Sequence, residues 1–555
     1  MTGQVQRTSA RERDSLLWWA VLVAAVVAGI VLRLYQLRSQ VLIDDEWHAV
    51  RMLIRADASA IATHFGFADY CIPLTLYFRW LYEHAALNEW QMHLPSLVAG
   101  VALLIAASTL LRQTLSLPAR AIWVALLAIS PVLIYFSRIA RPYALVAILG
   151  VVAVLAFRAW WRGDSRRGVS AAIYLVATFL AGWLHLLSLV FTLWPFAYYG
   201  VFLIRDLSRP STRENALRPL LRFSLLALAT LASLAAALVP PLVKDAGAMI
   251  GKAGSSSVSI DSLYRGVLMQ FGVTPAWVGV VMFALLVFGV RRLARRDRDF
   301  TTLLVSMMLV GTVVIALARP AWIVHQAVMV RYCVVALPFI LLFVAEGYVG
   351  VLERVRVAYL APLVTIAAMT GLYFAGPFPA MLYWPNQFMA DASFQFDFDP
   401  TANPYATMLQ LGPVSPFFLE LAKRPPGSVT LMETPASFNS NFTPDPWLQA
   451  IHRQKLKFAL ASPVCGTGDW DEYPYTATGV RFRSVAQLSD VLDGASYGAD
   501  YLVLRMRPWT VPPGIERPSP DMPACVEKVR QRLGEPTYRD EQITVFSLRG
   551  ANPGG

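Results

Sequence analysis

Three consecutive acidic residues, Asp44, Asp45 and Glu46, are the sharpest chemical feature of this 555-residue sequence. They follow a long apolar run that ends near Leu34, so we expect them at a membrane surface. Neighbouring carboxylates in such a place can take a proton from a hydroxyl group, which makes all three candidate catalytic residues. Acids are also typical of the first turn of a helix, and the spacing leaves both interpretations open.

Two arginines, Arg138 and Arg141, lie in a short segment between apolar runs and are followed by Tyr143. A guanidinium group matches two phosphate oxygens at once, so the pair predicts a phosphate-binding loop, with Tyr143 as a substrate contact. Pairing with the acidic residues explains these arginines equally well.

A third polar group lies between Arg319 and Tyr332. Arg331 and Tyr332 are candidates for the same phosphate site, and His325 is a candidate substrate contact; anchoring at the membrane interface is the alternative. His185 and Tyr70 are further candidate substrate contacts, although a single histidine at a helix end commonly has a structural role.

The motifs give little sign of a cofactor. The sequence has neither the Cys/His spacing of a zinc site nor a glycine-rich phosphate loop. We name no cofactor as certain, while the acidic run leaves a divalent cation, Mg²⁺ or Mn²⁺, open.

The composition indicates that lipid surrounds the elements that position these residues: 56% of residues are hydrophobic and 15% are charged. Runs of roughly spanning length predict about eleven transmembrane helices. They lie at 15–34, 94–112, 120–137, 142–161, 169–184, 188–204, 220–241, 276–293, 301–318, 332–352 and 357–375.

The basic residues predict the orientation of these helices. With a cytoplasmic N-terminus, the inner segments carry twenty arginines and the short outer loops carry seven arginines and lysines. The net charge of +12 therefore indicates membrane topology and not nucleic-acid binding. We predict a multi-pass protein of the inner (plasma) membrane, with the segment after residue 375 outside the cytoplasm.

The sequence divides into a transmembrane domain, residues 1–375, and a small α/β domain, residues 376–555. The outer loop 35–93 contains amphipathic stretches at 47–61 and 74–87, which predict helices on the membrane surface. In the second domain, strands are predicted at 428–433, 501–505 and 543–548, and helices at 485–492 and 525–533. Cys465 and Cys525 are either disulfide-bonded or buried free thiols.

Several motifs together resemble the type C glycosyltransferase superfamily, in particular the branch of protein O-mannosyltransferases and the lipid A aminoarabinose transferase. The resemblance covers residues 15–375, together with the helix number and topology. It is carried by Asp45-Glu46, the segment 69–77, His93-Leu94-Pro95-Ser96, the segment 138–143, and Arg331-Tyr332 with Pro338. The sequence departs from the pattern where His93 replaces an arginine and where Asp44 extends the acidic pair.

The resemblance implies the type C fold and inverting transfer of a hexose or pentose from a polyprenyl-phosphate sugar to a lipid, glycan or protein. It implies Asp45 as general base, Glu46 in positioning the acceptor, and Arg138, Arg141 and Arg331 at the departing phosphate. A transporter or flippase of lipid-linked sugars would need charges near the bilayer midplane and repeated halves, which the sequence lacks. A non-catalytic scaffold has no need of acids and arginines in its outer loops. An oligosaccharide ligase with a pyrophosphate-linked donor is the closest alternative.

Overall fold

A computed structural model gives the architecture of the chain. It describes residues 2–35, 37–42, 46–68, 70–163, 166–252, 254, 257–321, 323–324, 326–355, 360–377, 413–436, 445–461, 464–466, 482–495, 497–506 and 520–549. Asp44, Asp45 and His325 of the predicted site lie outside the described residues.

Contacts divide the chain into two compact units, each described by itself below. The membrane unit comprises Met1–Leu34, Ala56–Tyr77 and Leu94–Phe378. The sheet unit comprises Tyr35–Arg55, Phe78–His93 and Pro379–Gly555. The last division lies close to the predicted boundary after residue 375, but two parts of the predicted outer loop are grouped with the C-terminal sheet.

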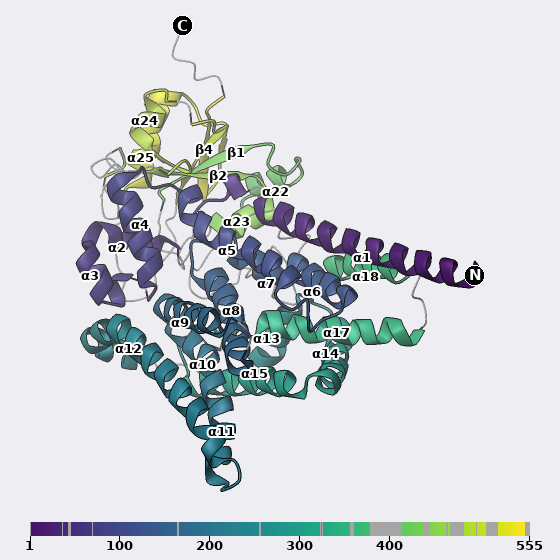
Figure 1. The fold of residues 1–555 in the computed structure, drawn as a ribbon. Helices are drawn as coiled ribbons and strands as arrows, with labels where there is room; N and C mark the ends of the chain where they lie inside the picture. Colours follow the sequence, from purple (N-terminus) through teal and green to yellow (C-terminus); the bar gives the residue numbers. More distant parts are fainter. Residues whose placement is uncertain are drawn as a thin grey trace. The chain divides into compact units, whose positions relative to one another are not determined.

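The membrane unit is built from helices (Figure 1). They are α1 (Thr2–Leu34), α3 (Ala58–Thr63), η2 (Gly66–Ala68), α4 (Ile72–His84), α5 (Glu89–Thr109), α6 (Leu117–Ile129), α7 (Pro131–Phe136), α8 (Tyr143–Arg162), α9 (Arg167–Leu184), η3 (Leu186–Ser188), α10 (Leu189–Thr192), α11 (Trp194–Ser208), α12 (Arg213–Lys252), α13 (Ile260–Phe271), α14 (Ala276–Arg296), α15 (Arg298–Ala318), α16 (Gln326–Tyr332), α17 (Leu337–Val355) and α18 (Ala361–Ala375). The first residues of α5 and the last of α4 are counted with the sheet unit.

The predicted multi-pass architecture is confirmed. Among the described residues, eight helices are long and apolar enough to cross a membrane. A ninth span is formed if α16 and α17, which meet at a bend of 90°, are taken together, while α6 and α18 are shorter apolar helices. Each predicted run therefore coincides with a helix or a helix pair. The run 120–137 is broken at Ser130, because Pro131 lacks the amide hydrogen that a continuous helix needs.

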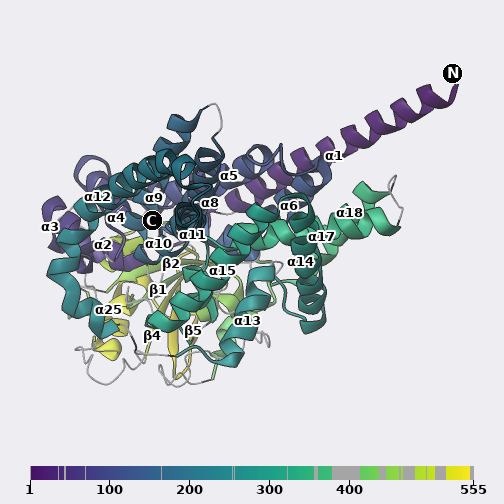
Figure 2. The same ribbon diagram turned by 60° about the horizontal axis from the view of Figure 1, so that its bottom comes forward.

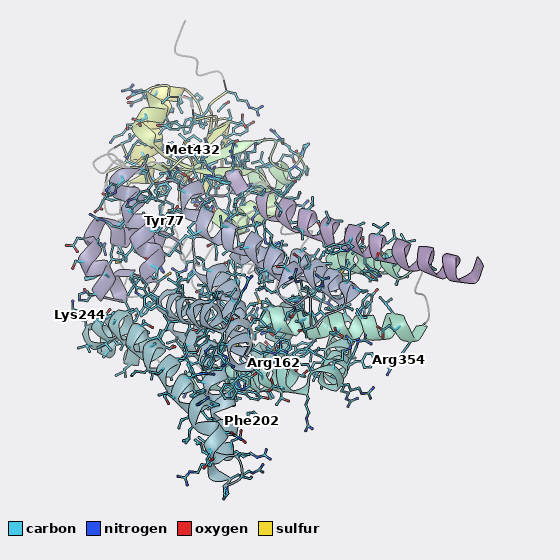
Figure 3. The ribbon with its side chains drawn as sticks, in the orientation of Figure 1. Tyr77, Arg162, Phe202, Lys244, Arg354 and Met432 are labelled. Carbon is cyan, nitrogen blue, oxygen red and sulfur yellow. A yellow bond between two sulfur atoms is a disulfide. The ribbon has the colours of Figure 1, made fainter. Side chains whose placement is uncertain are left out.

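Ion pairs gather the helix ends that were predicted to be cytoplasmic. Arg162 of α8, labelled in Figure 3, donates to Asp297 between α14 and α15 at 2.8 Å. Arg292 of α14 donates at 2.9 Å to Glu346 of α17, whose side chain is fully buried. Along the same two helices, a side chain on Gly289 would collide with the Phe343 carbonyl, so small residues permit the close packing of α14 against α17.

These ion pairs motivate a test of topology. Single cysteines at position 59, an exposed residue of the predicted outer loop 35–93, and at position 470 should both react with an impermeant thiol reagent from the non-cytoplasmic side, because the predicted topology places both outside. A cysteine at Arg205, in the predicted inner end of α11, is the control and should react only after the membrane is opened. Labelling of positions 59 and 470 from opposite sides would contradict the predicted helix number.

The sheet unit contains a six-stranded sheet of order β3-β2-β1-β4-β6-β5. Its elements are η1 (Leu37–Ser39), α2 (Glu46–Arg55), α22 (Pro416–Ala422), β1 (Thr430–Thr434), α23 (Asp445–His452), β2 (Lys455–Leu460), β3 (Val485–Gln487), α24 (Leu488–Leu492), β4 (Tyr501–Arg505), α25 (Met522–Leu533), β5 (Tyr538–Arg539) and β6 (Ile543–Ser547). Strands β3, β2, β1 and β4 are parallel, and β6 is antiparallel to both of its neighbours.

Helix α25 packs on one face of this sheet, as Figure 2 shows. Met432, labelled in Figure 3, belongs to the core between them, with Leu504 and Phe546 from the sheet and Val529 from α25. A disulfide joins Cys465 to Cys525 of α25, so the first alternative for these cysteines is confirmed. Cys333 is a buried free thiol, and Cys71 is also buried.

The predicted strands are found within two residues of their expected ends. The segment 485–492, predicted as a helix, begins instead as the edge strand β3 and is helical only from Leu488. Three β-strand residues at a sheet edge leave too little alternation to distinguish a strand from a helix start.

A buried ionic group lies on the sheet face opposite α25. The guanidinium group of Arg505 in β4 donates to the carboxylates of Glu433 in β1 and Asp445 in α23. Burial raises the pKa of Glu433 well above its usual range, and the nearby Asp445 carboxylate adds to this rise while Arg505 opposes it. Burial, with Arg505 close by, lowers the pKa of His452 to about 3.

The two shifts predict a plateau in stability against pH. The folded pKa of Glu433 lies above its unfolded value, so its contribution to stability is complete below the unfolded carboxyl pKa of about 4.3 and is lost as the pH rises through the folded pKa. His452 stays neutral, so its contribution is complete above the unfolded imidazole pKa of about 6.5 and is lost as the pH falls toward its folded pKa. The two slopes cancel between these values.

We therefore expect the unfolding midpoint of the full chain to fall above about pH 6.5, with a limiting slope of about 1.4 kcal/mol per pH unit for one proton. Glu433→Gln keeps the shape of the side chain without its titration and should flatten this decline. The measurement is thermal unfolding from pH 4 to 9, with Glu420→Gln, an exposed acid of the same unit, as the control. An unchanged decline in Glu433→Gln would show that another group titrates.

Candidate functional site

Glu46 begins α2 and is the one predicted acid that the described residues include. Its carboxylate oxygen Oε1 lies 2.8 Å from Nε2 of His93 in α5, and both side chains are fully buried. The departure at position 93 therefore has a structural use: a histidine, where the resembled pattern has an arginine, holds the last acid of the run. This contact fixes the start of α2 relative to the first turns of α5.

Arg138 lies after α7 and is buried. Its Nη1 donates to the carbonyl of Leu32, in the last turn of α1, at 3.2 Å. Burial lowers the pKa of Arg138 to about 10, which leaves the group charged at neutral pH. The residue thus ties the predicted phosphate loop to the end of α1.

The same loop is supported by Arg33, which the sequence analysis did not single out. Its fully buried guanidinium group donates to Ser137 Oγ at 3.2 Å, to the Gly29 carbonyl at 2.9 Å and to the Leu127 carbonyl at 3.1 Å. An arginine in the last turn of a membrane helix usually extends to the membrane interface. The sequence therefore did not indicate that the side chain of Arg33 points into the protein.

Five of the predicted residues form one cluster in the membrane unit, although they come from three separate parts of the chain. The ring of His185 lies 5.8 Å from that of Tyr143 and 5.4 Å from that of Tyr332. The guanidinium group of Arg331 lies over both tyrosine rings, at 5.8 Å from the centroid of Tyr143 and 5.2 Å from that of Tyr332. Arg141 lies close enough to His185 to affect its charge.

The cluster brings together charged and neutral hydrogen-bond donors. Burial first, and then the neighbouring Arg331 and Arg141, lower the pKa of His185 to about 3. The imidazole is therefore neutral at physiological pH and donates from one nitrogen only, beside two permanent guanidinium charges. Two cations, a neutral imidazole and two phenol groups form a set of donors that suits an anion with several oxygens.

The backbone of Arg141 is held by α5. Ser96 Oγ donates to the Arg141 carbonyl at 2.9 Å, and Ser96 lies one helical turn after His93. The motif His93–Ser96 thus makes one contact through its first residue, to Glu46, and another through its last residue, to the Arg141 carbonyl. Tyr70 lies in the turn before α4 with a φ of 60°, where its ring stacks on Phe65 at 6.2 Å.

The described residues contain no group of three or more His, Cys, Asp or Glu side chains placed to hold a metal ion. Asp44 and Asp45 are outside that part of the chain.

No protein-family model matches this chain, and no curated protein matches it. Among solved structures, it is similar to ArnT from Cupriavidus metallidurans bound to undecaprenyl phosphate, at 12% identity and a TM-score of 0.44. That match covers 97% of this chain and 99% of ArnT.

A second similarity is to the archaeal oligosaccharyltransferase AglB from Archaeoglobus fulgidus, solved with an inhibitory peptide and a dolichol-phosphate. The identity is 12% and the TM-score 0.40, over 88% of this chain and 69% of AglB. Another structure of the Archaeoglobus fulgidus enzyme, with Zn and sulfate, matches at 11% identity and a TM-score of 0.41, over 88% of this chain and 68% of that one.

These solved structures belong to the type C glycosyltransferases, the superfamily that the sequence motifs resemble. The three TM-scores lie below 0.5.

Proposed function

We propose that this protein is an inverting membrane glycosyltransferase that moves a hexose or pentose from a polyprenyl-phosphate donor to a lipid, glycan or protein acceptor. The reaction takes place on the non-cytoplasmic face of the inner (plasma) membrane, with the N-terminus in the cytoplasm. The convergence of Arg141, Tyr143, His185, Arg331 and Tyr332 is the observation that carries the proposal. Guanidinium groups gathered at the ends of apolar helices favour a phosphate that arrives on a lipid.

The chemistry assigns a role to each group. The acceptor oxygen attacks the anomeric carbon, the bond from that carbon to the phosphate oxygen breaks, and the sugar inverts. A carboxylate of the acidic run takes the hydroxyl proton as the new bond forms, and Asp45 is the assigned base. The polyprenyl phosphate leaves with an additional negative charge, which Arg141 and Arg331 stabilise, while Arg138 supports the loop.

Glu46 orients the acceptor in this proposal, and His93 keeps its carboxylate in place at 2.8 Å. Both are buried away from water, so their contact is stronger than the same pair would be at a surface. The neutral His185 and the two tyrosines donate hydrogen bonds to phosphate or sugar oxygens without adding charge.

An apolar cavity in the membrane unit supports a lipid-linked donor. It has a volume of about 670 Å³ and is lined by α1, α6 and α18, including Ala28, Ile129 and Phe374. Its walls are almost entirely hydrocarbon, so an isoprenoid chain can occupy it without burying an unsatisfied polar group.

The direct test is transfer by the purified chain in nanodiscs. Polyprenyl-monophosphate sugars should yield free polyprenyl phosphate and a glycosylated acceptor, and a matching polyprenyl-pyrophosphate sugar should not react. Mass spectrometry of lipid-phosphate sugars and surface glycans, in cells with and without the chain, identifies the sugar and acceptor. Turnover of the pyrophosphate donor alone would favour the oligosaccharide ligase, and an unchanged set of glycans and lipid-linked sugars would contradict the proposal.

A further inference from the structure

Residues 482–484 precede the edge strand β3 and are fixed to the sheet. The Ser484 carbonyl accepts a hydrogen bond from the Phe458 amide in β2 at 2.7 Å. Phe482 and Ser484 are buried, with exposed fractions of 4% each. This short segment, here named the clamp segment, therefore has the sheet as its support, and all of its contacts described below lie within the sheet unit.

Its central residue, Arg483, holds the chain just before the acidic run. Nη2 of Arg483 donates to the carbonyl of Leu37 at 3.3 Å and to that of Gln40 at 3.2 Å. Leu37 begins the short helix η1, and both accepting residues are buried. One guanidinium group thus satisfies two carbonyls and fixes the start of the acidic segment.

The clamp segment also binds the first residue of α5. Glu89, whose side chain is fully buried, accepts hydrogen bonds from the backbone amides of Ser484 at 3.1 Å and Arg483 at 3.3 Å. The Ser484 hydroxyl donates to the same carboxylate. A buried carboxylate bound by two amides and a hydroxyl is well satisfied, so the start of α5 is held firmly against the sheet.

That start of α5 carries the partner of Glu46. His93 lies one turn after Glu89, and its Nε2 lies 2.8 Å from Glu46. On the other side of the acidic run, the ring of Trp47 packs edge-on against Phe482 at 5.0 Å. Contacts of residues 482–484 thus reach both flanks of the acidic run, directly at residues 37, 40 and 47 and through α5 at Glu46.

We propose that the clamp segment positions the acidic run for catalysis, so that the C-terminal sheet is part of the transfer machinery. This role rests on the proposed function for its catalytic meaning, but the positioning itself is a structural claim. Arg483, Ser484 and Glu89 are positioning residues, because they act through Glu46 and its neighbours and do not contact the reacting atoms.

The test is hydrogen–deuterium exchange on the full chain with Arg483→Lys and Arg483→Ala. Lysine keeps the charge but lacks the planar guanidinium group, whose Nη2 reaches the two carbonyls while Nε lies 3.8 Å from Glu89. Exchange should quicken about tenfold at residues 37–42 and 46–55, the change expected for two lost hydrogen bonds, while β1 and β4 keep their protection. Arg532→Ala, an exposed arginine of α25, is the matched control and should change neither region.

Transfer kinetics separate the two claims. With the donor varied, kcat should fall about tenfold in Arg483→Lys while donor affinity stays within twofold, since the donor arginines are untouched. Unchanged exchange at residues 37–42 and 46–55 overturns the clamp whatever the activity. Faster exchange with unchanged kcat overturns its positioning role. If the wild-type chain transfers no sugar but exchange responds as expected, the proposed function fails and the structural claim stands.

Discussion

Asp45→Asn should lower the rate of sugar transfer by about 10²–10⁴-fold, the usual contribution of a general base. A sugar or amino-acid hydroxyl is a poor nucleophile at neutral pH, so its proton must leave as the bond to the anomeric carbon forms. Asparagine keeps the shape of the side chain and removes its basicity. Expression, folding and donor binding should therefore stay nearly normal, and single-turnover transfer with a separate measurement of donor affinity checks the result.

The acidic run offers its own comparisons. Glu46→Gln should be milder, because glutamine preserves a hydrogen bond to His93, and Asp44→Asn milder again. Asp57→Asn is a control of the same charge change, since Asp57 caps α3 by accepting from the Ala60 amide at 2.7 Å and asparagine caps equally well. A dead Asp44→Asn with an active Asp45→Asn would move the base by one residue. Activity in all three acidic variants would contradict the glycosyltransferase proposal.

Arg331→Lys should lower transfer on the order of a hundredfold, the effect of removing one contact to developing charge. Lysine retains the positive charge but replaces a planar fork with a single ammonium group. It also loses the packing of the guanidinium plane over Tyr143 and Tyr332, at 5.8 Å and 5.2 Å. Arg141→Lys should act in the same direction, and Arg138→Lys should act through the loop that it ties to α1.

Transfer kinetics and donor binding on the same preparations check this prediction. Arg205→Lys, at an exposed position in the last turn of α11, makes the same chemical change away from the cluster and should have no effect. Because the imidazole of His185 is neutral throughout the range from pH 5 to 8, its titration should not change the donor affinity in that range. Wild-type activity in Arg141→Lys, Arg138→Lys and Arg331→Lys would identify the three arginines as interfacial anchors.

The sequence predicts the helices well because lipid imposes a simple rule on their length and apolar content. It also singles out the residues that gather around His185, since arginines in short loops predicted to lie outside stand out against the charge pattern. Glu46 and His93 were both recognised, but a sequence separation of 47 residues hides their contact. No local pattern reveals that a histidine on one helix faces an acid at the start of another.

The buried contacts of the sheet unit could not be predicted from local sequence patterns. Glu433, Asp445 and Arg505 are ordinary charged residues in the sequence, and only the order of parallel strands brings β1 beside β4. Glu89 and Ser484 are separated by 395 residues along the chain. Edge strand β3 was mistaken for a helix because three residues carry too little periodicity. Long-range pairing, and not local propensity, decides these positions.

Helix α12 links the protein to the thickness of its bilayer. As a straight rod its 40 residues would extend for about 60 Å, roughly twice the hydrocarbon core of a membrane, so the helix must tilt, bend at the prolines inside it (Pro219, Pro240 and Pro241) or continue into the aqueous layer. Near its predicted outer end, Lys244 donates to Thr63 and Asp245 accepts from the Gly66 amide, both at 2.9 Å. These two contacts join α12 to α3 and η2, so a change in the tilt of α12 with bilayer thickness would also move these two segments. The length of the lipid chains would thereby affect the position of α3 and η2, the surface segments that follow the acidic run in the sequence.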